Sequence, residues 1–336
     1  MVSIGRDFKD AKALLAKLRA SRSRKLSQYP IALPHGTTTL RGTPHLHKIK
    51  GWLNKLGHTD RDLDKLKVIH IAGTKGKGST CAYIESMLLA HGARTGFPKR
   101  VGLYTSPHLI EYTERIRLNA NPISETKFAE NLFEIWDCLG DGPRSLQLLA
   151  LLSFHTFIKE GVDVAIYEAH HGGEYDVTNV VNQPAVTATT TIGLDHIDEL
   201  GPTIENIAWH KGGIFKTGAP ALSSPQVLEV SKILKCRAAA KGTSLRFIQA
   251  DLEDIPVPVQ RVNASLAREA CREFLYRQVG HILSEEDIQA GIRNFAWPGR
   301  FQTEQKNGVI WCLDGAHNPM SGLHTAAWFN SISHSR

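Results

Sequence analysis

A glycine-rich stretch near residue 75 has the residue types and spacing of a phosphate-binding loop. A β-branched run, residues 68–71, precedes it, and a helical pattern follows from Thr80 to His91. Glycines let backbone N–H groups turn toward phosphate oxygens, a lysine adds positive charge, and a serine hydroxyl can bind Mg²⁺. Two residues separate the first glycine from the Gly-Lys pair, whereas the commonest phosphate loop has four, and an ordinary glycine-rich turn is the alternative. The strand–loop–helix context favours nucleotide binding by Gly73, Thr74, Lys75, Gly76, Lys77, Gly78 and Ser79.

Further polar residues stand where other buried strands are expected to end. Ser106 follows an apolar run, Glu168 ends another, and the pair Asp195–His196 follows a third. Ligands of open α/β sheets gather beyond the carboxyl ends of the strands, so these side chains are expected to meet at one site. Mg²⁺ prefers oxygen ligands, which makes Glu168 the most natural ligand and His196 the least natural one. The alternatives are an unliganded loop carboxylate and a loop histidine.

The adjacent pair His170–His171 suggests a transition-metal site at first sight. Neighbouring residues on one loop rarely bind the same ion, so we do not expect this pair to act together as ligands.

The elements that must position these residues alternate between strands and helices. This alternation predicts an α/β fold with a mostly parallel sheet, helices on both faces and the phosphate loop after a strand. Residues 29–44, rich in Pro, Gly and Thr, are expected to form a loop. Strands are expected at 68–72, 101–105, 162–167, 185–192, 219–223, 245–248 and 309–313, and helices at 7–19, 45–56, 80–91, 124–139, 145–159, 226–241, 264–279, 285–293 and 322–329.

Composition limits the kind of protein and of partner. The 336 residues carry a net charge of +7, with basic residues scattered and without interleaved aromatic residues, which favours a small anionic ligand over nucleic acid. Five cysteines without a Cys-x-x-Cys pair indicate reduced thiols. No run approaches the ~20 apolar residues of a membrane span, so we expect no membrane partner. No apolar signal segment follows the N-terminus, so we expect a cytoplasmic protein, with a mitochondrial address as the less favoured alternative.

Seven motifs occur in an order that resembles the folylpolyglutamate synthases, in their fungal or other eukaryotic branch. These enzymes belong to the Mur-ligase-like family of ATP-dependent amide ligases, and the resemblance runs from about Leu40 to Pro319. The motifs are residues 73–79, 105–108, Glu168 with 172–173, 193–201, 210–215, 297–300 and 314–317.

The resemblance implies a reaction and a set of site residues. ATP would phosphorylate a substrate carboxylate, and the amine of L-glutamate would attack the acyl phosphate. Lys77, Lys211 and His317 would be catalytic, with Lys211 carbamylated, and Asn263, Arg300 and Asp314 would help to hold ATP. One Mg²⁺ would be bound by Ser79 and Glu168 with Ser106 close by, and a second by His196. K⁺ is a further cation that the resemblance allows. Taken alone, Lys211 could be a solvated lysine, Arg300 a turn residue, and Asp314 and His317 caps of the next helix.

The chain departs from the family pattern at several positions. Imidazoles at 170 and 171 replace a small, glycine-containing stretch, the segment 142–150 lacks the usual aromatic and threonine residues, and Gly212 stands where alanine is usual. The resemblance implies an ATP-binding domain over 1–296 and the start of a C-terminal domain over 297–336. That second domain is expected to be truncated to one strand and one helix.

Three functional hypotheses therefore stay open. The first is a monomeric ligase that adds L-glutamate to the γ-carboxyl of tetrahydrofolate. The second is a ligase of the same chemistry that acts on another carboxylic acid in specialised metabolism. The third is a homologue that binds nucleotide without turnover.

Overall fold

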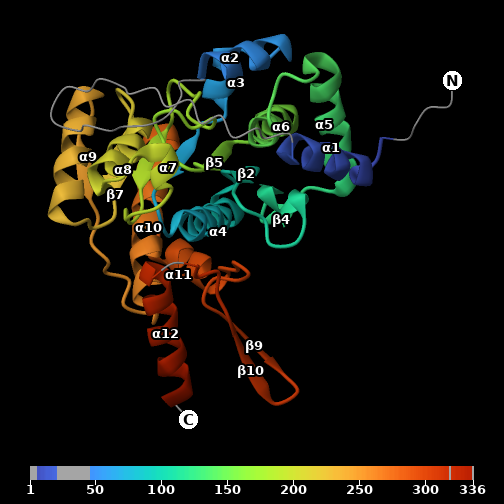
Figure 1. Ribbon diagram of the computed structural model, residues 1–336. Helices are drawn as coiled ribbons and strands as arrows, with labels where there is room; N and C mark the ends of the chain where they lie inside the picture. Colours follow the sequence, from blue (N-terminus) through green and yellow to red (C-terminus); the bar gives the residue numbers. More distant parts are fainter. Residues whose placement is uncertain (1–5, 21–45, 318, 335–336) are drawn as a thin grey trace.

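The computed structural model describes residues 6–20, 46–317 and 319–334. The chain forms a layered α/β domain followed by a β-hairpin and a last helix that extend away from it (Figure 1). The strands are β1 (Ile69–Ala72), β2 (Val101–Tyr104), β3 (Ile116–Leu118), β4 (Asn121–Pro122), β5 (Val164–Glu168), β6 (Val186–Thr189), β7 (Ala221–Ser223), β8 (Leu245–Phe247), β9 (Gln302–Lys306) and β10 (Val309–Leu313). The helices are α1 (Phe8–Ala20), α2 (Leu46–Lys55), α3 (Asp60–Lys65), α4 (Lys77–Thr95), α5 (Glu125–Leu139), α6 (Ser145–Glu160), α7 (Ile197–Leu200), α8 (Ile204–Lys211), α9 (Leu228–Ala240), α10 (Pro258–Val279), α11 (Glu285–Arg293) and α12 (Pro319–His334).

The main sheet places β1, which leads into the glycine-rich loop, between two parallel neighbours. The strand order is β4-β3-β2-β5-β1-β6-β7-β8. All pairs from β2 to β8 are parallel, whereas β3 and β4 form an antiparallel edge. The carboxyl ends of β1, β2, β5 and β6 therefore meet at one edge of the sheet, where a ligand site is expected.

Successive side chains of the buried strands pack alternately into two apolar layers on opposite faces of the sheet. In β5, Val164 and Ile166 point into the layer that contains α4, α10 and α11. Ala165 and Tyr167 point into the opposite layer, which contains α1, α2, α5 and α6. Figure 1 shows α4 and α11 on one side of the sheet and α1, α5 and α6 on the other. Because parallel strands are covered on both faces, these strands consist of nearly continuous apolar residues.

Most elements expected from the sequence are confirmed, with differences at the ends of helices. Helix α5 begins after Ser124, whose hydroxyl caps it by accepting a hydrogen bond from the Lys127 amide. Helix α4 starts at Lys77, three residues earlier than expected, so the phosphate-loop lysine belongs to its first turn. Helix α10 starts six residues early, at Pro258, because proline is well suited to the first position of a helix. Helices α3, α7 and α8 and strands β3 and β4 were not predicted, and the loop expected at 29–44 lies outside the described residues.

The expectation of a lone strand at 309–313 was wrong. This segment is β10, which pairs antiparallel with β9 in a separate two-stranded sheet. Asn307 and Gly308 connect the two strands with positive φ angles of 52° and 76°. Asn-Gly is a strong hairpin signal because both residues tolerate this backbone conformation, so the hairpin could have been predicted from the sequence. Helix α12 is also longer than expected, and its Trp328 packs edge-on against Phe301, with ring centroids 5.3 Å apart.

Within the described ranges, no helix has both the length and the apolar character needed to cross a membrane.

A buried ion pair fastens the β3–β4 edge to α4. The Glu85 carboxylate is 2% exposed, lies 3.1 Å from the Arg117 guanidinium and accepts a 3.0 Å hydrogen bond from the Ala120 amide. Burial raises the pKa of Glu85 to about 7, although Arg117 opposes the shift. The Arg117 guanidinium also lies 5.2 Å from the centre of the Trp297 ring, which connects this edge to the segment before the hairpin.

This raised pKa predicts a pH dependence of stability. Between the unfolded pKa near 4.5 and the folded pKa near 7, the folded state holds a proton that the unfolded state has lost, so ionisation of Glu85 destabilises the protein as pH rises. We expect Glu85→Gln to gain about 1–3 kcal/mol in unfolding free energy relative to the unmodified chain between pH 5 and pH 8. Urea unfolding of both proteins at the two pH values measures this difference. A pH-independent difference would contradict the assignment.

Candidate active site

The glycine-rich loop is held against the segment that follows β6. The amides of Thr74 and Lys75 donate hydrogen bonds to the Thr191 carbonyl at 2.9 and 3.2 Å. The Thr74 hydroxyl donates to the Gly193 carbonyl at 3.0 Å and accepts from the Gly193 amide at 3.1 Å. Gly76 directly precedes α4 at the N-cap position, with a φ of 90° and without a side-chain cap. The amides at this helix start therefore face the cavity without a capping side chain, which suits an anion.

A cavity of about 810 Å³ lies over this loop. Among the described residues, its lining includes every predicted site residue except Gly73 and Lys211. The structure therefore brings the residues on the wall together, and their roles as site residues stay predictions. The predicted residues on the wall are Thr74, Lys75, Gly76, Lys77, Gly78, Ser79, Ser106, Glu168, His196, Asn263, Arg300, Asp314 and His317.

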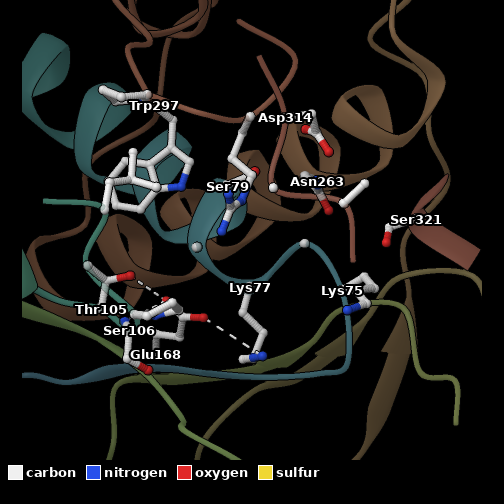
Figure 2. A pocket seen from close by; sticks show the side chains of 18 of the residues that line it. Lys75, Lys77, Ser79, Thr105, Ser106, Glu168, Asn263, Trp297, Asp314 and Ser321 are labelled. Carbon is white, nitrogen blue, oxygen red and sulfur yellow. Dashed lines mark hydrogen bonds and ion pairs between the residues drawn. The ribbon is translucent and has the colours of Figure 1, made fainter. Parts of the chain in front are cut away.

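Glu168 is the central charged group of the cavity wall. Its carboxylate is buried, with 4% of the residue exposed, and accepts hydrogen bonds from the Thr105 hydroxyl and, at 3.2 Å, from the Ser106 amide. The Lys77 ammonium lies 3.8 Å from the same carboxylate. Figure 2 shows Glu168 between Thr105 and Lys77. The carboxylate and the Thr105 hydroxyl are oxygen donors of the kind that Mg²⁺ prefers, and Ser79 and Ser106 line the same cavity. The Lys77 ammonium supplies positive charge beside the carboxylate.

Thr105 is a site residue that the sequence reasoning missed, because Ser106 was chosen from the same motif. The structure brings the hydroxyl of Thr105 and the backbone amide of Ser106 to Glu168. Both positions directly follow β2, and the pleat of a strand decides which of two neighbouring side chains faces a given layer. Trp297 was also missed as a wall residue, although its motif was recognised.

The two adjacent histidines lie in different surroundings, as expected for residues that do not share a ligand. His170 is buried, and its Nε2 is 2.7 Å from the Tyr104 hydroxyl. His171 stacks on His196, with ring centroids 4.3 Å apart and an interplanar angle of 8°. Burial lowers the pKa of both stacked imidazoles, and the neighbouring His171 lowers that of His196 further. Both rings are therefore neutral near pH 7.

Lys211 lies behind the loop rather than on the cavity wall. It is 2% exposed, and its ammonium donates hydrogen bonds to the carbonyls of Gly73 at 2.6 Å and His171 at 3.4 Å. Burial lowers the pKa of Lys211 well below its ordinary value, and the positive charge of Lys77 adds to this effect. A neutral amine is the form that reacts with CO₂, so these surroundings suit the predicted modification.

Residues from the C-terminal segment close one side of the cavity. The Lys75 ammonium donates to Nε2 of His317 at 3.0 Å, and Nδ1 of that histidine donates to the Gly315 carbonyl at 2.8 Å. The Asp314 carboxylate accepts hydrogen bonds from the Phe301 amide and the Thr325 hydroxyl, each at 2.9 Å.

Two other predicted nucleotide residues lie near these contacts. Asn263 and Asp314 face the loop from the side opposite Glu168 (Figure 2). The Arg300 guanidinium bonds the Gly299 carbonyl at 2.9 Å and lines the same cavity. Through its hydrogen bonds with the Phe301 amide and the Thr325 hydroxyl, Asp314 connects the start of the hairpin to α12.

This chain is similar in sequence to folylpolyglutamate synthases. It is 39% identical to the folylpolyglutamate synthase of Neurospora crassa over an alignment of 356 positions, which covers 98% of this chain and 66% of the relative. The chain therefore spans slightly less than two thirds of that relative's length. No protein-family model matches the sequence.

Solved structures agree with this relationship. The Mycobacterium tuberculosis folylpolyglutamate synthase complexed with ADP and AMPPCP superposes with a TM-score of 0.74 at 27% identity, over 85% of this chain and 71% of that one. Escherichia coli FolC in complex with DHPP and ADP superposes with a TM-score of 0.75 at 28% identity, over 98% of this chain and 75% of that one.

The packing of Gly73 offers a test of how firmly the loop is held. A Cβ at this position, where φ is 151°, would lie 1.8 Å from the Thr190 hydroxyl and 3.1 Å from the Thr190 amide. We expect Gly73→Ala to lower the unfolding free energy by about 3 kcal/mol. Gly96→Ala is the matched control, because Gly96 also has a positive φ of 86° but has no atom within 4 Å of its Cβ position. The control is expected to cost about 1–2 kcal/mol. Equal costs in urea unfolding would show that the loop shifts freely.

Proposed function

The chain belongs to the folylpolyglutamate synthase family, and from this premise we propose that it is an ATP-dependent ligase that joins the amine of L-glutamate to the γ-carboxyl of tetrahydrofolate. The observation that carries the proposal is the cavity that gathers the glycine-rich loop, Glu168 and the residues of the 297–317 segment. The complexes of two related structures with ADP or AMPPCP support ATP as the nucleotide.

The proposed reaction has two steps. The γ-phosphoryl group of ATP passes to an oxygen of the substrate carboxylate, and ADP leaves. The glutamate amine then attacks the acyl carbon of this acyl phosphate, inorganic phosphate leaves, and the amine proton passes to solvent. The protein mainly aligns the reactants and offsets negative charge.

Different residues of the cavity would hold the phosphates, the rest of ATP and the metal ion. The amides at the start of α4 and the Lys77 ammonium would hold phosphate oxygens, and Arg300 would offset charge on the γ-phosphate. Asn263 and Asp314 would bind the rest of ATP. Ser79 and Glu168 would bind Mg²⁺, which neutralises phosphate charge when it is present. The resemblance further implies a second cation near His196, and K⁺ stays a prediction.

A second candidate function has support from the positions where the chain departs from its family. His170, His171 and Leu146 all line the cavity. Their side chains form part of the cavity wall at positions where the chain departs from the family pattern, which favours a ligase of the same chemistry with another carboxylic acid as substrate.

One experiment separates these candidates. The purified chain is incubated with ATP, Mg²⁺, L-glutamate and tetrahydrofolate, and the products are read by mass spectrometry and phosphate release. We expect a tetrahydrofolate product that is longer by one or more glutamates. Phosphate release without such a product would refute the folate substrate and favour the other carboxylic acid.

Nucleotide binding is tested separately with Lys77→Ala. Removing the ammonium is expected to weaken ATP binding by about 10–100-fold, because hydrogen bonds to charged groups contribute about 1.5–3 kcal/mol. Lys65→Ala is the control, since the Lys65 side chain is 63% exposed on α3. Isothermal titration calorimetry measures both affinities. If the unmodified chain fails to bind ATP, or Lys77→Ala binds it equally well, both ligase hypotheses fail.

We also propose that Lys211 is carbamylated in the active protein. Its burial and lowered pKa favour the neutral amine that attacks CO₂. The chain labelled with ¹³C-bicarbonate is expected to show a carbamate carbon signal by NMR that Lys211→Met lacks. Lys216→Met is the matched control, because burial also lowers the pKa of Lys216, to about 8. A signal that persists in Lys211→Met would contradict the assignment.

A further inference from the structure

Three metal-binding side chains meet at the edge of the cavity. They are His171, His196 at the start of α7, and Glu199 in α7. One ligand atom from each side chain lies within 4.8 Å of the other two. His196 has a φ of 51°, and this left-handed conformation turns the chain at the point where its ring stacks on His171.

The ring of His171 differs from the rings of three buried histidines in its hydrogen bonding. The rings of His58, His91 and His170 each have a hydrogen-bond partner, at 2.7–2.8 Å. Within the ranges that the structure describes, neither ring nitrogen of His171 has one, although the ring is largely covered. A ring nitrogen without a protein partner keeps its lone pair free for a metal ion, and His171 lines the cavity, from which an ion can reach it.

The Asp195 carboxylate lies beside His196 but forms no hydrogen bond with its ring. Oδ1 of Asp195 is 3.9 Å from Nε2 of His196, which is too long for a hydrogen bond. Asp195 instead pairs with the Lys75 ammonium at 3.4 Å. The two imidazoles and the exposed Glu199 carboxylate are therefore available for an ion.

We propose that His171, His196 and Glu199 form a binding site for one divalent transition-metal ion, such as Zn²⁺ or Co²⁺. Two imidazoles and one carboxylate are a donor set typical of these ions, whereas Mg²⁺ prefers oxygen donors and water. Metal bonds of about 2.0–2.2 Å require the ligand atoms to approach one another more closely than 4.8 Å. Rotation of the exposed Glu199 and the half-buried His196 provides this approach.

This site changes what the second cation of the reaction would be. Because His196 is shared with the proposed second Mg²⁺ position, one ion excludes the other, and the additional imidazole of His171 selects the transition metal. This consequence for catalysis rests on the proposed function, whereas metal binding by the three side chains does not.

The test measures metal binding by the full chain without nucleotide or substrate. The metal-free protein is titrated with Zn²⁺ by calorimetry and with Co²⁺ by its visible absorption. We expect one ion per chain, with binding that millimolar Mg²⁺ does not displace. His171→Leu and Glu199→Gln are each expected to weaken binding by at least about 100-fold, since loss of partners one shell further out already costs 10–100-fold.

The control is His47→Leu, which removes one exposed imidazole of α2 and is expected to leave the affinity unchanged. Glu199→Gln guards against misfolding of His171→Leu, because residue 199 is exposed and its substitution leaves the core intact. Absence of saturable binding, equal weakening by His47→Leu, or displacement by Mg²⁺ would each overturn the proposal. If ATP binding fails while Zn²⁺ binding follows this pattern, the proposed ligase function falls and the metal site stands.

Discussion

The buried carboxylate of Glu168 is the constraint on which the cavity depends. A charge removed from water must be compensated by hydrogen bonds and opposite charge, or its burial becomes strongly unfavourable. The compensation comes from the end of β2, through Thr105 and Ser106, and from the start of α4, through Lys77. The pairing of β5 with β1 places Glu168 level with Ile71, just before the glycine-rich loop. The Glu168 carboxylate at the end of β5 thus connects the end of β2 with the helix start that follows β1.

Much of this arrangement could be predicted from the sequence because it follows from local rules. Apolar runs that end in polar residues located β1, β2, β5 and β6, and the known geometry of parallel sheets brought their ends together. A serine at a helix start and the glycines of the phosphate loop can be recognised from a few neighbouring residues alone. The cavity that contains Ser79, Glu168 and Asp314 is therefore where the motifs indicated.

The remaining features depend on distances that sequence patterns do not encode. Strands β3 and β4 have three and two residues, too few for a periodic signal, and they are fixed by the ion pair between Arg117 and Glu85. The stacking of His171 on His196 brings together the loops that follow β5 and β6, two strands that have β1 between them in the sheet. The choice between Thr105 and Ser106 depends on the exact pleat of β2. By contrast, the hairpin of β9 and β10 was predictable from Asn307–Gly308 and was overlooked.

The hydrogen bond between Lys75 and His317 joins residues that are 242 positions apart. On a ribosome, the sheet around β1 and β5 can assemble well before the segment that carries His317 has been synthesised. The phosphate loop would then be formed while the cavity still lacked the side that His317 provides. Closure of the cavity over a nucleotide is consequently coupled to the arrival of the hairpin and α12 rather than to the folding of the sheet.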